Sequence, residues 1–176
     1  MLKSFPKNSV GVEIGVDRGG FSQRILKIVK PKKLHLIDPW KYEEEEIYKN
    51  SLYGGKVGKN QEELEKKYQK VLQEFQKQIK NDVVNIHRDY SEKVLNSFAN
   101  DYFDWAYIDG NHLYEFVTKD LELCHLKIKK GGIIVLDDYG VEGWWEDGVT
   151  KAVDKFINKD MVKVIKIKNN QCILKK

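Results

Sequence analysis

The sequence has few cysteines and arginines, and each scarcity excludes a kind of protein. Its two cysteines, Cys124 and Cys172, lack the spacing of a metal-binding motif and suit a reduced protein without a disulfide framework. The basic charge comes almost entirely from lysines interleaved with glutamates, whereas surfaces that bind the phosphate groups of nucleic acids favour clustered arginines. We therefore do not expect a nucleic-acid partner.

Long hydrophobic runs are also absent. No stretch approaches the roughly 20 apolar residues that a transmembrane helix needs, and residues 1–6 lack the apolar segment of a signal peptide. Hydrophobic residues nevertheless make up 41% of the 176 residues, which is enough for one domain with its own core. We expect a soluble, cytoplasmic protein of one domain without a membrane partner. Whether it forms a homo-oligomer stays open.

The sequence does contain a regular alternation of short apolar runs and helical patterns. Five nearly continuous runs, typical of strands buried on both faces of a parallel sheet, cover residues 10–14, 34–37, 83–86, 103–108 and 133–136. Two further runs, predicting an antiparallel hairpin at the sheet edge, cover residues 162–167 and 172–174. Apolar stripes with helical period lie at residues 21–29, 64–79, 113–128 and 149–156. This order predicts an α/β fold with a doubly wound, mostly parallel seven-stranded sheet.

The segment from Lys41 to Lys80 is too long for a plain crossover between two strands. It combines a run of glutamates, residues 43–46, with a stretch that contains several glycines and with one apolar stripe of helical period. One interpretation is a solvated connection followed by an ordinary helix. The other is a mobile lid inserted over an active site.

Glu13 and Asp17 lie among glycines in the loop after the first predicted strand. Open α/β sheets bind ligands at the carboxyl ends of their strands, and Gly15 and Gly19 allow the backbone to approach a ligand closely. Carboxylates would repel a dinucleotide pyrophosphate but attract a ligand with sulfonium and ammonium groups. The loop therefore predicts a site for a cationic cofactor.

Two more aspartates follow the next predicted strands. Asp38 lies about twenty residues after the glycine loop, the separation expected for a carboxylate that accepts both hydroxyls of a ribose. Asp89 follows the third strand and could accept a hydrogen bond from an adenine amino group. Each aspartate alone could instead cap a helix or form a turn.

The pattern Glu-x-Gly-x-x-x-Gly with an acidic residue ending the second strand resembles class I S-adenosylmethionine-dependent methyltransferases. The resemblance spans nearly the whole chain and implies a Rossmann-like sheet that binds S-adenosylmethionine. It implies Glu13, Gly15 and Gly19 on the methionine side, Asp38 at the ribose and Asp89 at the adenine. Tyr90 departs from the pattern, because related sequences often carry a small serine there.

Carboxylates also end the fourth and fifth predicted strands. Asp109 and the pair Asp137-Asp138 follow strands that should be neighbours, roughly 4.8 Å apart, so their side chains can converge. Clustered carboxylates repel one another unless a cation lies among them, and hard oxygen ligands favour Mg²⁺ or a similar divalent ion. An acidic turn without a metal is the alternative.

The stretch Asp109-Gly-Asn-His-x-Tyr-Glu and the later Gly-Gly-Ile-Ile-Val-Leu-Asp-Asp-Tyr resemble the metal-dependent O-methyltransferases, especially the macrocin O-methyltransferase group. The resemblance implies Asp109, Asp137 and Asp138 as metal ligands. It also implies a small hydroxylated acceptor (a sugar, polyol or phenol) that chelates the ion through two oxygens.

His112 is the candidate catalytic base, because a neutral imidazole titrates near working pH. The macrocin-like group tends to offer an aspartate two positions past the first ligand, where this chain has Asn111. The alternative is that His112 belongs to the first turn of a helix that Asn111 caps.

The four tryptophans fall into two groups. Trp144 and Trp145 follow the fifth strand and could form an aromatic wall for the acceptor, or could pack in the core or against another subunit. Trp105 should be core, and Trp40 could pack near an adenosine.

Three other functions stay open. One is metal-independent methylation of an amine or carboxylate, and another is a nicotinamide-dependent oxidoreductase, which the carboxylates of the glycine loop disfavour. The third is a ligand-binding relative without catalysis, since fold alone does not establish activity.

Overall fold

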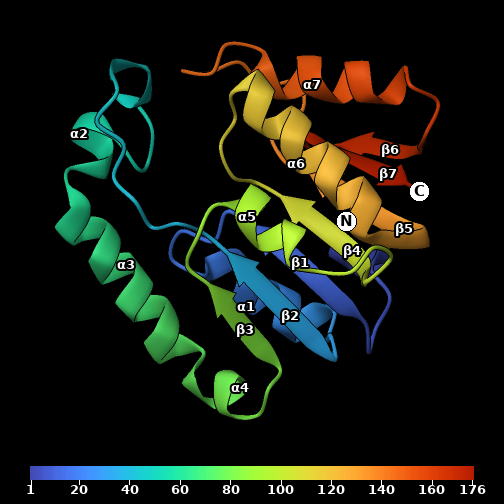
Figure 1. The fold of residues 1–176 in the computed structure, drawn as a ribbon, viewed down its shortest axis with the longest axis horizontal. Helices are drawn as coiled ribbons and strands as arrows, with labels where there is room; N and C mark the ends of the chain where they lie inside the picture. Colours follow the sequence, from blue (N-terminus) through green and yellow to red (C-terminus); the bar gives the residue numbers. More distant parts are fainter.

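The computed structural model describes all 176 residues, which fold around one sheet with helices on both faces (Figure 1). The strands are β1 Val10–Ile14, β2 Lys33–Ile37, β3 Val84–His87, β4 Phe103–Ile108, β5 Ile128–Leu136, β6 Lys163–Lys168 and β7 Gln171–Lys175. The helices are α1 Gly20–Ile28, α2 Gly55–Gly58, α3 Gln61–Glu74, α4 Gln76–Lys80, α5 Ser91–Asn96, α6 Tyr114–Lys127 and α7 Gly148–Ile157, with 3₁₀ turns η1 Leu2–Ser4 and η2 Glu46–Tyr48. No helix combines the length and the apolar composition needed to cross a membrane.

The seven strands lie in the order β3-β2-β1-β4-β5-β7-β6. The first five are parallel, and β7 runs antiparallel to both of its neighbours, so the predicted sheet and its C-terminal hairpin are confirmed. The strand order reverses direction at β1, whose neighbours are β2 and β4. Ile14 pairs with Ile37 on one side and Ile108 on the other, so these three strands end at one level. A crevice at such a switch point is the usual ligand site of this architecture.

Two apolar cores enclose the sheet, one on each face. Along β4, Trp105 and Tyr107 are buried against α1 and α3, while Ala106 and Ile108 are buried against α6 and α7. This alternation follows from the strand geometry, in which successive side chains point to opposite faces. Both faces are covered, which explains why the strands read as continuous apolar runs.

Helix ends and short helices depart from the expected pattern. The stripe expected over residues 113–128 ends at Lys127, and β5 begins at Ile128, so Gly131 and Gly132 lie inside the strand rather than after the helix. The stripe over residues 64–79 is divided into α3 and α4 at Phe75, whose backbone has φ −100° and ψ 12°. Helices α2 and α5 carry too few turns to give a periodic signal.

The segment 41–80 runs along one side of the molecule, as the teal and green part of Figure 1 shows. Helix α3 anchors it, because Leu64, Val71 and Phe75 are buried in the core that also contains Trp105. The part before α3 includes η2 and α2 and borders the cavity described next.

Candidate active site

A cavity of about 1380 Å³ lies at the carboxyl ends of β1, β2 and β4. Its wall combines the glycine loop, the segment 41–67, the start of α5, the loop after β4 and the loop that carries the paired tryptophans. Ligand pockets for one small molecule typically measure about 300–1,000 Å³. The cavity therefore has room for a cofactor and a second molecule.

Two glycines shape the loop after β1 in different ways. Gly15 has φ +84°, and a Cβ atom there would lie 1.9 Å from the carbonyl oxygen of Asp109, so only glycine lets these two strand ends approach. Gly19 has φ +75° and packs against the ring of Phe75 instead. The cavity wall includes Gly15 but not Gly19.

Glu13 lies in the cavity wall with an unsatisfied carboxyl group. The residue is 1% exposed, and its Oε2 atom is buried without a hydrogen-bond partner. Burial raises the pKa of Glu13 to about 8. A buried carboxyl group of this kind fits the ammonium group of a ligand.

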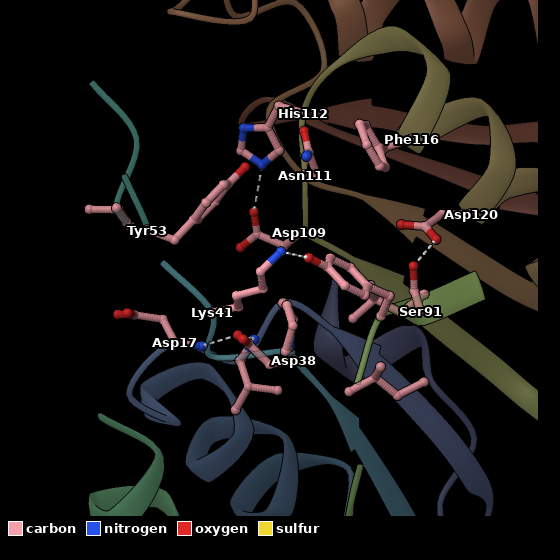
Figure 2. Close-up of a pocket in the computed structure, with 18 of the residues that line it drawn as sticks. Asp17, Asp38, Lys41, Tyr53, Ser91, Asp109, Asn111, His112, Phe116 and Asp120 are labelled. Atoms are coloured by element: carbon pink, nitrogen blue, oxygen red, sulfur yellow. Dashed lines mark hydrogen bonds and ion pairs between the residues drawn. The ribbon is translucent and has the colours of Figure 1, made fainter. Parts of the chain in front are cut away.

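Asp38 holds the glycine loop in place and also lines the cavity. Its Oδ2 atom accepts hydrogen bonds from the backbone N–H groups of Val16 and Asp17, at 2.9 and 3.0 Å, and Oδ1 accepts one from Trp40 at 2.8 Å (Figure 2). Each carboxylate oxygen has two lone pairs, so Oδ2 is fully used and Oδ1 keeps one acceptor site for a ribose hydroxyl.

Two other residues expected near the cofactor already have charged or polar partners. The Asp17 carboxylate pairs with Lys67 of α3 at 2.6 Å, so it joins the glycine loop to the inserted segment. Trp40, whose place near an adenosine was an open expectation, is buried in the wall and donates its indole N–H to the Asp17 carbonyl oxygen at 2.8 Å.

Asp89 does not reach the cavity wall. Its carboxylate pairs with Lys93 at 2.5 Å and accepts the backbone N–H of Tyr90 at 2.9 Å, directly before α5 begins. The structure instead places Ser91 and Asp120 in the wall at this end of the cavity. Sequence reasoning missed Asp120, although an acidic residue on the apolar stripe of α6 is a signal that could have found it.

Asp109, His112 and Asp138 come together on the opposite side of the cavity. Their ligand-type atoms all lie within 4.8 Å of one another. His112 Nε2 is 3.3 Å from Asp109 Oδ1, and Nδ1 is 3.6 Å from Asp138 Oδ2. His112 precedes α6, which begins at Tyr114, so it is not a residue of the first helical turn. Burial raises the pKa of both aspartates.

Asp137 does not join this group, in contrast to the metal-ligand set expected from the sequence. Its Oδ2 atom accepts a hydrogen bond from the Tyr107 hydroxyl at 2.7 Å. Tyr107 belongs to the core on the α1 side of the sheet. Both residues lie beyond the end of β5, where Asp138 takes a left-handed backbone with φ +55°, and the two side chains diverge.

Four aromatic side chains surround His112. Its ring centroid lies 4.5 Å from Trp145 and 6.5 Å from Trp144, and Trp144 is 5.4 Å from Tyr48 and 6.0 Å from Tyr53. All four line the cavity, and Figure 2 shows Tyr53 reaching from its own segment toward His112. Trp105, by contrast, is fully buried in the core as expected.

A family model described as a methyltransferase domain matches residues 12–139, which include the glycine loop and both aspartates of the group around His112. The chain belongs to this methyltransferase family. The expected class I S-adenosylmethionine-dependent methyltransferase is thus confirmed at the level of family and fold, and the oxidoreductase alternative is disfavoured.

Individual proteins are similar to this chain in sequence or in fold. The uncharacterized protein R132 of Acanthamoeba polyphaga mimivirus is 29% identical over 163 residues, covering 89% of this chain and 63% of that protein. The chain thus spans less than two thirds of the relative's length. Among solved structures, SMU.1697c of Streptococcus mutans, in complex with SAH, has a TM-score of 0.63 at 13% identity, covering 99% of this chain and 92% of that one. The O-methyltransferase NovP has a TM-score of 0.65 at 19% identity, and the match covers 98% of this chain and 72% of NovP.

Proposed function

We propose that this methyltransferase methylates a hydroxyl oxygen of a small neutral acceptor, with a divalent cation held by Asp109 and Asp138. The observation that carries the proposal is the convergence of Asp109, His112 and Asp138 within 4.8 Å at the cavity wall. The cofactor would lie between Glu13 and Asp38, on the neighbouring part of the same wall. Bound there, S-adenosylmethionine supplies an electrophilic methyl group on a sulfonium and leaves as a neutral thioether.

The donor atoms fit a divalent cation. Neighbouring ligands of an octahedral ion with bonds of about 2.1 Å lie roughly 3 Å apart, and the candidate ligand oxygens of Asp109 and Asp138 lie within 4.8 Å of each other. Both carboxyl groups lie in a wall where burial disfavours their charged forms. A cation would relieve these costs, and it would lower the pKa of an acceptor hydroxyl.

His112 is placed to accept the proton of the acceptor hydroxyl. Asp109 orients one ring nitrogen, and the aromatic ring of Trp145 packs edge-on against the imidazole. A positioned base of this kind commonly accelerates a proton transfer by about 10²–10⁴-fold. If His112 were a third metal ligand instead, the mixed oxygen and nitrogen donors would suit Mn²⁺ or Fe²⁺ as well as Mg²⁺.

The aromatic group of Tyr48, Tyr53, Trp144 and Trp145 supports a ring-shaped acceptor. Aromatic faces stack on sugar or phenol rings, and this group lies beside His112. Acidic side chains dominate the nearby wall, namely Glu43, Glu45, Asp109, Glu115 and Asp138. Such a wall repels carboxylates, phosphates and nucleic acids, so the acceptor should be neutral.

A second candidate follows from the same acidic and aromatic wall, because it would also attract an ammonium group. In that case the protein would methylate an amine without a metal. Removing metal with EDTA separates the two functions: transfer of a labelled methyl group that survives complete metal removal would contradict the metal-dependent proposal.

The segment 41–80 would act as the lid of this site. Tyr48 and Tyr53 come from it, and Lys41 ties it to the loop after β3 through a 2.7 Å hydrogen bond to the Tyr90 hydroxyl (Figure 2). The Tyr90 hydroxyl in turn donates to Glu43 at 2.9 Å. Closure by such a segment would exclude water from the transfer reaction.

The direct test is Mn²⁺ titration by calorimetry on the wild-type protein, Asp138→Asn and Asp137→Asn. The two variants make the same chemical change at adjacent positions, but only Asp138 belongs to the group around His112. We expect Asp138→Asn to weaken Mn²⁺ binding at least tenfold, while Asp137→Asn binds like the wild type. Equal losses in both variants, or no Mn²⁺ binding by the wild type, would contradict the proposed site.

A further inference from the structure

Asp120 is a buried acidic residue in the cavity wall that the proposed chemistry does not use. It lies on α6 and is 3% exposed, and its Oδ1 atom accepts a hydrogen bond from the Ser91 hydroxyl at 2.5 Å. Its Oδ2 atom has no hydrogen-bond partner within the chain and lies 3.8 Å from the position that a Cβ on Gly110 would take. Burial raises the pKa of Asp120 to about 7.

No cation within the chain compensates this carboxyl group. The nearby lysines are already paired, Lys119 with Glu92 at 3.0 Å and Lys93 with Asp89 at 2.5 Å. A buried carboxyl group that accepts only one hydrogen bond can accept others. Asp120 lines the cavity, so a donor from a ligand could use that remaining capacity.

The position of Asp120 in the cavity indicates which ligand group could supply the donor. Figure 2 shows Ser91 and Asp120 at one end, Tyr53 at the other, and Asp38 and Asp109 between them. Glu13 fits the ammonium end of S-adenosylmethionine, and Asp38 fits the ribose. The base of the nucleoside would then extend beyond Asp38 toward the end formed by Ser91 and Asp120.

We propose that Asp120, oriented by Ser91, recognises the adenine of the cofactor by accepting a hydrogen bond from its exocyclic amino group. This inference rests on the S-adenosylmethionine site proposed above and replaces Asp89 in that role. Hypoxanthine, which carries a carbonyl oxygen in place of the amino group, would present an acceptor to another acceptor. The site should therefore discriminate against an inosine analogue of the cofactor.

The test is calorimetric titration with S-adenosylhomocysteine and S-inosylhomocysteine on four proteins: the wild type, Asp120→Ala, Asp120→Asn and Asp89→Ala. The wild type and Asp89→Ala should bind the adenosyl compound at least tenfold more tightly than the inosyl compound. Asp120→Ala should bind the adenosyl compound roughly ten- to hundredfold more weakly and lose the preference, the range expected for a hydrogen bond to a charged or buried group. Asp120→Asn should keep most of the adenosyl affinity but accept both bases, because an amide can offer either a donor or an acceptor.

The variants distinguish recognition from a general structural role. Asp120→Asn keeps the shape and a hydrogen-bonding partner for Ser91, so its relaxed base preference would not follow from misfolding. An unchanged preference for the adenosyl compound in both Asp120 variants would overturn the inference while leaving the cofactor site intact. A wild-type protein that binds neither compound would overturn the proposed cofactor site itself.

Discussion

Asn111 Nδ2 donates a 2.9 Å hydrogen bond to the Tyr48 hydroxyl and so joins the loop after β4 to the segment between β2 and β3. The Oδ1 atom of Asn111 accepts the backbone N–H of Leu113 at 3.0 Å, which fixes the side chain directly before α6. The residue beside the candidate base therefore also holds the proposed lid, so acceptor binding and lid closure share one contact.

Removing the Tyr48 hydroxyl should loosen the lid. Tyr48→Phe leaves the half-buried Asn111 amide without its partner, which costs about 1 kcal/mol, or roughly fivefold more frequent local opening. Hydrogen exchange of residues 46–58 measures this change. Tyr139→Phe is the matched control, because it removes a 2.8 Å hydrogen bond to Asp154 away from the lid. Equal protection of residues 46–58 in Tyr48→Phe and wild type would contradict the role of this contact.

Glu13 should release a proton when the cofactor product binds. Its pKa of about 8 in the free protein means that it is mostly protonated at pH 7, and pairing with an ammonium group requires the ionised form. Calorimetry of S-adenosylhomocysteine binding at pH 7, in buffers with different ionisation enthalpies, should show release of roughly one proton. Glu13→Gln should abolish the release and weaken binding about tenfold or more. Proton release that persists in Glu13→Gln would assign it to another group.

Glu13 should also affect stability at high pH. The folded protein raises the pKa of this carboxyl group, so the stability contributed by its protonated form is present below about pH 4.5 and is lost as pH rises through about 8. Glu13→Gln cannot ionise. Its Tm should therefore fall less than that of the wild type between pH 6 and pH 8.5 in thermal unfolding followed by circular dichroism.

The buried His35, which contacts the half-buried His87, should make the fold sensitive to acid. His35 Nδ1 lies 2.9 Å from His87 Nε2, and burial lowers the pKa of His35 to about 4. A lowered histidine pKa means that stability is full above about pH 6.5 and is lost as pH falls toward 4. Between pH 7.5 and 5.0 the free energy of unfolding should fall by up to about 2 kcal/mol from this group.

Urea unfolding of His35→Phe at the two pH values isolates the effect of His35. The variant keeps an aromatic ring among Phe98, Tyr102 and Phe103 but cannot titrate. Its loss of stability between pH 7.5 and 5.0 should be smaller than that of the wild type. The same pH dependence in both proteins would show that other groups control the acid sensitivity.

Replacing His112 separates a base from a metal ligand. If His112 accepts the proton, His112→Ala should bind Mn²⁺ within about threefold of the wild type, while methyl transfer to catechol as a probe acceptor falls about 10²–10⁴-fold. Calorimetry measures the first quantity and transfer of a labelled methyl group the second. Parallel loss of Mn²⁺ binding and methyl transfer would assign His112 to the metal.

The sheet could be predicted from the sequence because its strands are covered on both faces. A strand such as β4 therefore consists almost entirely of apolar residues, and its predicted bounds agree with the structure. The start of β5 could not be read in this way, because Lys129, Lys130 and Gly131 interrupt the apolar pattern. Helix α5, with six residues, is shorter than two helical turns and carries no period of its own.

The sequence predicts which site residues lie at the ends of strands, but it does not predict the directions of their side chains. Glu13, Asp38 and Asp109 follow from their positions at one edge of a parallel sheet. Asp137 and Asp138 could not be told apart, because their opposite directions depend on the face that each takes where β5 ends. Asp120 lies eleven residues beyond Asp109 on a helix, and only the packing of α6 brings it to the cavity.

The most direct test of the central claim is calorimetric titration of the wild-type protein with S-adenosylhomocysteine, with Asp38→Ala as the comparison. Asp38 connects the glycine loop to the proposed ribose contact, so the variant should lose most of the affinity. We predict one binding site per chain in the wild type and binding at least tenfold weaker in Asp38→Ala. A folded wild-type protein that gives no binding heat at several temperatures would contradict the account.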